Sequence, residues 1–273
     1  MSGFFLGLQK ILPQHSLSRL VGWLAQSQIP LIRRPFIHLF AWAYDISLAD
    51  AERKELDEYH SFNDFFTRAL ADGARPLPEQ PNALACPVDG TISQIGQIQS
   101  DLLVQAKGHQ YTLNSLAGKT GKGFEDGAFC SIYLAPSNYH RIHLPWDGTL
   151  VETRAIPGAL FSVNGMTEAG IPGLFCRNER LVCRFETEHG PMLLVLVGAL
   201  IVASIETVWE GPASPYREEI VTQYEQAFRR GDEIGRFLLG STVICCFVKN
   251  AVTLAEHLDA GTVVRLGEMI GAP

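Results

Sequence analysis

The chain lacks a hydrophobic run long enough to cross a membrane as a helix. Its main apolar run, Pro191 to Ile205, has 15 residues, whereas a helical span needs about 20. That stretch is rich in Val and Ile and contains Gly198, so it predicts buried strand structure instead. A secretory signal with an alanine-type cleavage site is absent as well.

Paired cysteine motifs are also missing. The six cysteines form no Cys-x-x-Cys motif and no metal-like pairing with histidine, and several of them lie in apolar, strand-like runs. We therefore predict reduced, buried cysteines in a cytosolic protein, and no metal site. The sequence has no P-loop, no dinucleotide glycine fingerprint and no Gly-x-Ser-x-Gly nucleophile elbow.

Acidic residues are absent from the first 44 residues. That segment carries four basic residues and a charge of +4, while the remainder has 18 basic and 29 acidic residues and a charge of −11. A basic head on an acidic body favours an anionic surface as the partner of the head. Nothing in the sequence indicates nucleic acid as a partner, because the body is acidic and does not interleave basic with aromatic residues.

Apolar residues recur at helical spacing in this basic head. The runs are Phe4, Phe5, Leu8, Ile11 and Leu12, ended by Pro13; Leu17, Leu20, Val21 and Leu24, capped by Ser16; and, after Pro35, Phe36, Ile37, Leu39, Phe40, Trp42 and Tyr44. Short amphipathic helices with aromatic and basic residues predict attachment in a bilayer interface. Packing of the same helices on the core of the protein is the alternative.

The texture of the sequence changes near residue 79. Before it, Ser61 and Asp64 resemble a capping box that starts a helix, whose apolar face is formed by Phe62, Phe65, Phe66, Ala69 and Leu70. After it come short apolar runs separated by Gly, Pro, Asn and Asp, the pattern of a β-rich domain. We predict an α+β fold: an N-terminal helical membrane-associating region, residues 1–78, and a β-rich catalytic domain, barrel-like or sandwich-like, residues 79–273. The segment from Pro215 to Arg230 fits either a helix or a polar loop.

The tripeptide Gly240-Ser241-Thr242 stands directly before the β-branched run that begins with Val243 and Ile244. This order predicts a buried strand that starts almost at the serine. Because Gly240 has no Cβ, the peptide before Ser241 can adopt a strained shape that opens its carbonyl to attack by the Ser241 hydroxyl. A bulge or a tight strand entry is the alternative explanation.

Two further segments supply side chains for chemistry. Asp89 lies in Pro87-Val88-Asp89-Gly90, and His140 and His143 follow an apolar strand. With Ser241, Asp89 and one of these histidines make up a nucleophilic triad, in which the histidine is the base and the aspartate orients it. In an extended chain residues three apart point to opposite faces, so a turn is needed for both histidines to line one pocket. A plain Asp-Gly turn and a His-x-x-His metal pair are the alternatives, but no third metal ligand has a suitable spacing.

Motifs along nearly the whole chain are similar to those of bacterial phosphatidylserine decarboxylase proenzymes, a pyruvoyl-dependent family. The resemblance rests on Phe65-Phe66-Thr67-Arg68 with Arg75-Pro76, Pro87-Val88-Asp89-Gly90, Gln105-Ala106-Lys107-Gly108-His109, Tyr139-His140-Arg141-Ile142-His143, Phe161-Ser162-Val163-Asn164, Arg177-Asn178-Glu179-Arg180, Val197-Gly198-Ala199, Ser204-Ile205-Glu206-Thr207-Val208-Trp209 and Gly235-Arg236-Phe237-Leu238-Leu239-Gly240-Ser241-Thr242.

The resemblance implies that the chain cleaves itself between Gly240 and Ser241. The Ser241 hydroxyl would attack the Gly240 carbonyl to give an ester, elimination would leave dehydroalanine, and hydrolysis would yield ammonia and a pyruvoyl group at residue 241. His143 would deprotonate the serine, with Asp89 as its partner. The products would be a β chain, residues 1–240, and an α chain, residues 241–273, held together as a heterodimer, with further dimerisation left open.

The same resemblance implies the reaction. The pyruvoyl group, a covalent cofactor derived from Ser241, would form a Schiff base with phosphatidylserine and act as the electron sink for its decarboxylation to phosphatidylethanolamine. His140 would lie beside that group and assist the substrate carboxylate or the protonation. The enzyme is expected to bind an anionic membrane surface peripherally, on the cytoplasmic side of the cell membrane. A serine hydrolase or protease that uses the same triad on an intact chain is the alternative.

Overall fold

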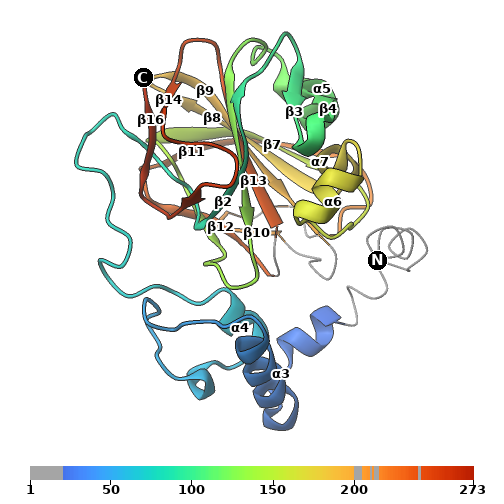
Figure 1. Ribbon diagram of the computed structural model, residues 1–273, viewed down its shortest axis with the longest axis vertical. Coiled ribbons are helices and arrows are strands. Elements are labelled where there is room, and N and C mark those ends of the chain that lie inside the picture. Colours follow the sequence, from blue (N-terminus) through green and yellow to red (C-terminus); the bar gives the residue numbers. More distant parts are fainter. Residues whose placement is uncertain (1–20, 200–204, 210, 212–214, 239–240) are drawn as a thin grey trace.

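The computed structural model describes residues 21–199, 205–209, 211, 215–238 and 241–273 (Figure 1). Residues 21–26 are helical. The helical elements that follow are α3 (Pro30–Ala43), η1 (Leu56–Glu58), α4 (Phe62–Phe66), η2 (Ala106–Gly108), α5 (Leu113–Ala117), η3 (Gly118–Gly121), α6 (Gly165–Gly170) and α7 (Leu174–Arg177). The strands are β1 (Leu84–Ala85), β2 (Gly90–Gln97), β3 (Leu102–Val104), β4 (Gln110–Thr112), β5 (Ala128–Leu134), β6 (Arg141–His143), β7 (Gly148–Ile156), β8 (Arg180–Thr187), β9 (Gly190–Val197), β10 (Ile205–Thr207), β11 (Ile220–Phe228), β12 (Glu233–Phe237), β13 (Ser241–Phe247), β14 (Thr253–Leu254), β15 (Val263–Val264) and β16 (Met269–Ala272).

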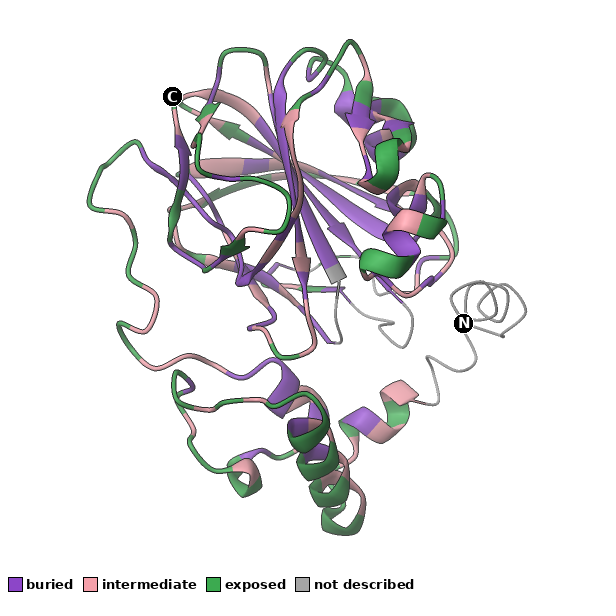
Figure 2. Cartoon of the chain, viewed as in Figure 1, coloured by how far each residue is buried: buried purple, intermediate pink, exposed green. Residues whose placement is uncertain are grey.

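An eight-stranded antiparallel sheet forms the centre of the molecule, in the order β11-β7-β8-β9-β13-β5-β2-β15. Both faces of its central strands are buried (Figure 2). Because successive side chains of a strand point to opposite faces, Val243 and Cys245 of β13 enter one hydrophobic core and Ile244 and Cys246 enter the other. This double burial explains the continuous apolar run over β9.

Different elements cover the two faces. The sheets β1-β16-β14 and β10-β12-β6 close the first core, to which they contribute Ile270, Ile234 and Ile142. The pair β3-β4 and the helices α5 and α7 close the second core, with Leu113 and Phe175 among its members. No helix in the described ranges is long and apolar enough to cross a membrane.

The expected sheet-rich α+β class is confirmed, and the large sheet is open rather than closed into a barrel. The expectation of a helix or a polar loop between Pro215 and Arg230 is wrong over Ile220–Phe228, which forms the edge strand β11. Exposure alternates along the first half of β11 until a bulge between Gln223 and Gln226 interrupts the register. The polar residues of this segment obscured the strand pattern in the sequence. They lie on the side of an edge strand that faces water.

All six cysteines are free thiols, five of them buried and Cys176 half-buried. Burial raises the pKa of these thiols, for example that of Cys130 to about 12 and that of Cys246 to about 12. A thiol with a raised pKa is protonated at neutral pH and unreactive. The cysteines therefore serve as small apolar side chains of the core.

The N-terminal helices have a small aromatic core of their own. Phe36 of α3 stacks on Phe62 of α4 with ring centroids 4.2 Å apart, and Phe40 meets Phe62 edge-on at 4.8 Å. Ser61 caps α4 by accepting a hydrogen bond from the backbone N–H of Asp64, as the capping pattern predicts. The expectation that the helix extends to Ala69 and Leu70 is wrong, because α4 ends at Phe66 and Leu70 forms an isolated bridge with Ala51. One face of α3 thus packs on the protein itself, which corrects the expectation that Phe40 belongs to a membrane-facing surface.

The opposite face of α3 is apolar and open. Leu31, Leu39 and Trp42 are 89%, 63% and 80% exposed, and their spacing places them on one side of the helix. The run that begins at Phe4 and its counterpart at Ser16 and Leu17 lie outside the described residues. The proposed boundary between residues 78 and 79 stays a prediction; α3 and α4 precede it and β1 follows it.

Candidate active site

Three neighbouring strands of the large sheet each have one terminus at the same edge of the sheet. β2 begins at Gly90, β5 ends at Leu134 and β13 begins at Ser241. Tyr133 pairs with Thr91 on one side and with Thr242 on the other, and Ser241 pairs with Leu134. Antiparallel pairing therefore brings Asp89, the segment after β5 and the backbone of Ser241 to one edge of the sheet.

The two histidines lie beside the segment that leads into β13. After β5 the chain turns and returns as β6, which pairs with β12 so that His143 faces Glu233. The backbone carbonyl of His140 accepts a hydrogen bond from the backbone N–H of Phe237 at 2.9 Å. Both histidines thus flank the residues that precede position 241, and Gly240 itself lies outside the described residues.

The ring of His143 is held at both nitrogens. Nδ1 lies 2.8 Å from the carbonyl oxygen of Gly231, and Nε2 lies 3.0 Å from the hydroxyl of Tyr139. Since a carbonyl only accepts, Nδ1 carries the proton, so Nε2 is the acceptor and the Tyr139 hydroxyl donates to it. Burial lowers the pKa of His143, and the Gly231 carbonyl and the Glu233 carboxylate partly oppose this shift. His143 is therefore neutral at pH 7 and presents a basic nitrogen.

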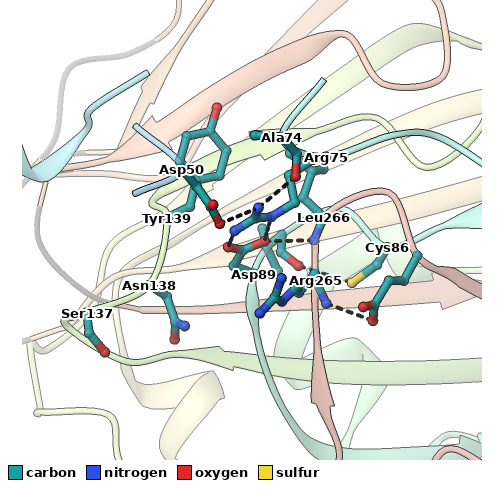
Figure 3. A network of polar contacts seen from close by, with 12 residues as sticks. Asp50, Ala74, Arg75, Cys86, Asp89, Ser137, Asn138, Tyr139, Arg265 and Leu266 are labelled. Carbon is teal, nitrogen blue, oxygen red and sulfur yellow. Dashed lines mark hydrogen bonds and ion pairs between the residues drawn. The ribbon is translucent and has the colours of Figure 1, made fainter. Parts of the chain in front are cut away.

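Asp89 is bound by an arginine. Its two carboxylate oxygens accept hydrogen bonds from Nε and Nη2 of Arg75 at 2.9 and 2.7 Å, and the backbone N–H of Leu266 adds a third bond at 2.8 Å. Arg75 also donates to Asp50 at 2.8 Å, so it bridges the segment after α3 and the sheet edge (Figure 3). This clamp raises the pKa of Arg75.

The expected hydrogen bond between Asp89 and His143 is therefore not made. The carboxylate is engaged by Arg75, whose fork geometry matches it with two charge-assisted bonds. The Gly231 carbonyl orients the imidazole instead. The two residues are linked through the backbone, where the N–H of His143 donates to the carbonyl of Pro87, two residues before Asp89.

His140 is fully buried and stacks on Phe66, with ring centroids 3.9 Å apart. Neither ring nitrogen has a hydrogen-bond partner within the described part of the chain. Burial lowers the pKa of His140 to about 3; the nearby charge of Arg68 acts in the same direction, and the carbonyls of Pro136 and Ala135 act in the opposite one. The ring is thus neutral and desolvated, and the carbonyls of Pro136 and Ala135 lie near its nitrogens without forming a well-aligned hydrogen bond.

The lowered pKa of His140 predicts acid lability. An unfolded chain protonates this histidine below about pH 6.5 and the folded chain only near pH 3, so its contribution is intact above pH 6.5 and is lost as the pH falls. We expect about 2 kcal/mol of lost unfolding free energy between pH 6.5 and 5. Urea unfolding of the Ser241→Ala chain would measure it. His140→Phe should reduce this slope and leave the part that His143 contributes through its own lowered pKa. His257→Gln, at an exposed position, should leave the slope unchanged; equal slopes in all three would contradict the assignment.

A cavity of about 390 Å³ adjoins this cluster. Asp89, Arg75, Tyr139 and the segment Ser137–Asn138 line it, together with residues after α3 and around β15. Figure 3 shows several of these residues. Sequence reasoning named Asp89 but gave no role to Arg75 or Tyr139, although both lie in motifs on which the resemblance rests. No cluster of three or more His, Cys, Asp or Glu side chains suited to a metal ion is found within the described ranges.

Comparisons with known proteins identify similar proteins and family models that match this chain. A family model described as phosphatidylserine decarboxylase matches residues 62–272, and a second, described as PSD, matches residues 4–45. Three similar curated proteins carry the name phosphatidylserine decarboxylase proenzyme. That of Psychrobacter cryohalolentis is 48% identical over 271 residues, 98% of either chain. That of Alcanivorax borkumensis is 48% identical over 277 residues, 98% of this chain and 95% of its own. That of Pseudomonas putida is 47% identical over 282 residues, 100% of this chain and 98% of its own.

Proposed function

Since the chain belongs to the phosphatidylserine decarboxylase family, we propose that it matures by cleaving itself between Gly240 and Ser241 and then converts phosphatidylserine to phosphatidylethanolamine. The cleavage would leave a pyruvoyl group at residue 241. The observation that carries the proposal is the meeting of Asp89, His140 and His143 at the sheet edge where β13 begins. The proenzyme names of the relatives support a processing step.

The residues at this edge fit a small covalent group at position 241. His140 offers two buried ring nitrogens without a partner among the described residues, and its backbone is bonded to Phe237, four residues before the site. A neutral imidazole donates one hydrogen bond and accepts another, which suits a group that contains carbonyl oxygens. His140 and the backbone of β13 would hold the pyruvoyl group, which supplies an electron-withdrawing carbonyl for the substrate amine.

His143 is the general base of the proposed cleavage. Its Nε2 lone pair removes the proton of the Ser241 hydroxyl, and the oxygen attacks the Gly240 carbonyl carbon. The bond between that carbon and the nitrogen of residue 241 breaks as the proton passes to the nitrogen, which leaves an ester. The Tyr139 hydroxyl, now bonded to Nε2 at 3.0 Å, must release this atom or pass the proton to it.

Asp89 has a revised role in this proposal. It acts through its contacts with Arg75 and Leu266, which join the segment after α3 and the strand region around β15 to the start of β2. The carboxylate thus positions the backbone from which the Pro87 carbonyl holds the His143 N–H. Asp89 supports the base without contacting its ring.

The two products of cleavage would remain a heterodimer. β13 begins at Ser241 and pairs along its whole length with β5 and, from Thr242 onward, with β9. Its side chains from Val243 to Phe247 are buried in the two cores. Separation of the α chain would expose all of these apolar groups to water, at a cost of about 1.5–3 kcal/mol for each large side chain.

Membrane binding is proposed for the exposed face of α3. Leu31, Leu39 and Trp42 are open to solvent while the other face of the helix is packed, and the head of the chain carries +4. An apolar face with basic residues in the same segment is the pattern of a helix that lies in a lipid interface. This attachment would hold the site at the cytoplasmic surface of the membrane, where the substrate lies.

Replacement of Leu31, Leu39 and Trp42 together by Gln should release the enzyme from vesicles. Burying such side chains in lipid contributes about 1–3 kcal/mol each, so we expect vesicle binding to weaken at least about tenfold. Sedimentation with phosphatidylserine-containing vesicles measures it. Leu102→Gln with Met269→Gln, on β3 and β16 away from α3 (Figure 1), is the matched control. Wild-type binding by the α3 variant would show that another surface meets the lipid.

A serine hydrolase is the alternative function of the same constellation, and it differs in a measurable way. It would keep an intact chain and would release no carbon dioxide. The test is to incubate the purified protein with phosphatidylserine labelled at the serine carboxyl. Release of labelled carbon dioxide by a protein that consists of two fragments supports the proposal, and ester hydrolysis by an intact chain contradicts it.

A further inference from the structure

Arg68, which follows α4, is a buried cation with an unused donor. The residue is only 5% exposed to solvent. Nη2 donates to the carbonyl oxygens of Ser137 and Asn138 at 2.9 and 3.3 Å, whereas Nη1 has no hydrogen-bond partner within the described residues. No described carboxylate forms an ion pair with it. A guanidinium stays charged in proteins, so this buried charge has no carboxylate in contact; the charge of Asp89 acts on it from farther away, and that carboxylate is already paired with Arg75.

The other buried arginines show that this is unusual in the molecule. Arg154 is paired with Glu152 and Glu219, and the half-buried Arg75 is paired with Asp50 and Asp89. Arg180 has no carboxylate in its hydrogen bonds either, but each of its three side-chain nitrogens donates to a backbone carbonyl. A buried donor left unsatisfied costs about 1–3 kcal/mol, more for a charged group. Arg68 therefore has the electrostatics of a residue that awaits an anion.

Arg68 lines the cavity of about 390 Å³ beside the candidate active site. Charged residues of both signs surround this cavity: Asp45, Asp50, Asp89, Arg68, Arg75 and Arg265. Asp50 and Asp89 are engaged by Arg75. Phe66, two residues before Arg68, carries the stacked ring of His140. Asp45 lines the cavity and lies two residues after the end of α3. The exposed face of α3, with Leu31, Leu39 and Trp42, is the proposed lipid contact.

Resting on the proposed function, we propose that Arg68 binds the phosphodiester of the phospholipid headgroup in this cavity. The headgroup has two anionic groups, the serine carboxylate and the phosphodiester, and their different fates in the reaction decide which of them Arg68 should bind. The carboxylate loses its charge during decarboxylation, so a cation bound to it would stabilise the substrate more than the transition state and slow the reaction. The phosphodiester keeps its charge in substrate and product. Arg68 thus anchors the part of the headgroup that does not react.

Binding requires a small rearrangement of the segment after β5. Nη1 has no solvent-accessible surface in this structure, and the Ser137 and Asn138 carbonyls hold Nη2. A phosphate oxygen would accept from Nη1 and compete with these carbonyls for Nη2. Charge-assisted bonds to phosphate are stronger than bonds to a neutral carbonyl, so the exchange favours the phosphate.

Soluble dihexanoyl phospholipids provide the test. We expect Arg68→Gln to raise the KM for dihexanoylphosphatidylserine by about tenfold to a hundredfold, the loss of one or two charge-assisted hydrogen bonds, with kcat changed by less than about threefold. The affinity for dihexanoylphosphatidylethanolamine, measured by calorimetry, should fall by the same factor, because the product retains the phosphate. The KM of Arg68→Lys should lie between those of the wild type and Arg68→Gln. Arg265→Gln, an exposed position on the same cavity, is the control and should change KM by less than about threefold.

Three outcomes would overturn the inference. Unchanged affinity of Arg68→Gln for the product would exclude a phosphate contact. Weaker binding of the substrate alone would place Arg68 on the carboxylate. An equal rise in KM for Arg265→Gln would show that Arg68 acts only as one of several positive charges near the cavity and not through a specific contact. Calorimetry with the product on the Ser241→Ala background reports binding even where a variant does not mature. Absence of carbon dioxide release by the wild type would contradict the proposed function and leave this binding comparison intact.

Discussion

Ser241→Ala is expected to abolish maturation and activity together. Without the hydroxyl oxygen no acyl shift to residue 241 can occur, so the chain stays intact at 273 residues and the pyruvoyl group does not form. The wild type should instead yield fragments of residues 1–240 and 241–273, the smaller without a free amino terminus. Mass spectrometry of the purified proteins reads out both, and we expect decarboxylation to fall by at least about a thousandfold.

Thr242 offers the matched control for this substitution. Its buried hydroxyl has no hydrogen-bond partner in the described part of the chain, and Thr242→Val keeps the shape of the side chain next to the cleavage site. This variant should still cleave. Efficient cleavage of Ser241→Ala would contradict the mechanism, and an intact Thr242→Val chain would show that packing at the start of β13, rather than the nucleophile, limits the reaction.

The two histidines should separate maturation from decarboxylation. His143→Ala removes the base, which contributes about a hundredfold to ten-thousandfold in such steps, so self-cleavage should slow by that order. Time courses of fragment formation after refolding measure it. Because burial lowers the pKa of His143, the base stays neutral below the ordinary histidine range. The cleavage rate of the wild type should therefore hold level down to pH 6.5 and decline only in more acid solution.

His140→Ala should cleave normally yet decarboxylate about a hundredfold more slowly, since its ring is proposed to contact the pyruvoyl group. The ring also fills space against Phe66, and His140→Phe preserves that stacking while it removes both nitrogens. Low activity in both variants, with normal fragments, assigns the loss to the nitrogens. If His140→Ala fails to cleave while His143→Ala matures, the two roles are reversed.

Several features of the site are local enough to be predicted from the sequence. β-branched residues after Ser241 predict that a strand begins there, and β13 does begin at that residue. Ser61 and Asp64 predict the start of α4, and the structure has the capping bond. In these cases the relevant interactions are between residues close in sequence, or follow from the period of a strand or helix. Long-range pairing was not needed to see them.

Partners across the fold could not be predicted in this way. The hydrogen bond from His143 to Gly231 joins residues 88 positions apart, and Arg75 holds Asp89 because two segments from different elements meet at the sheet edge. An aspartate and a histidine in one motif set suggested a direct contact, but an arginine fork is the stronger partner for a carboxylate. The pairing of β6 with β12 and the packing of the helices decide which residues hydrogen-bond to His143 and Asp89.

The helix α3 shows the same division. Its sequence determined a helix rich in aromatic and aliphatic residues and the sets of residues that share a face, because side-chain spacing sets which residues lie together. Tertiary packing decided which face is used. Phe36 and Phe40 are taken by the aromatic core with Phe62, and Leu39 and Trp42 remain exposed. Both faces are apolar, so hydrophobicity alone could not choose between them; the choice depended on the shape of α4 and its three phenylalanines.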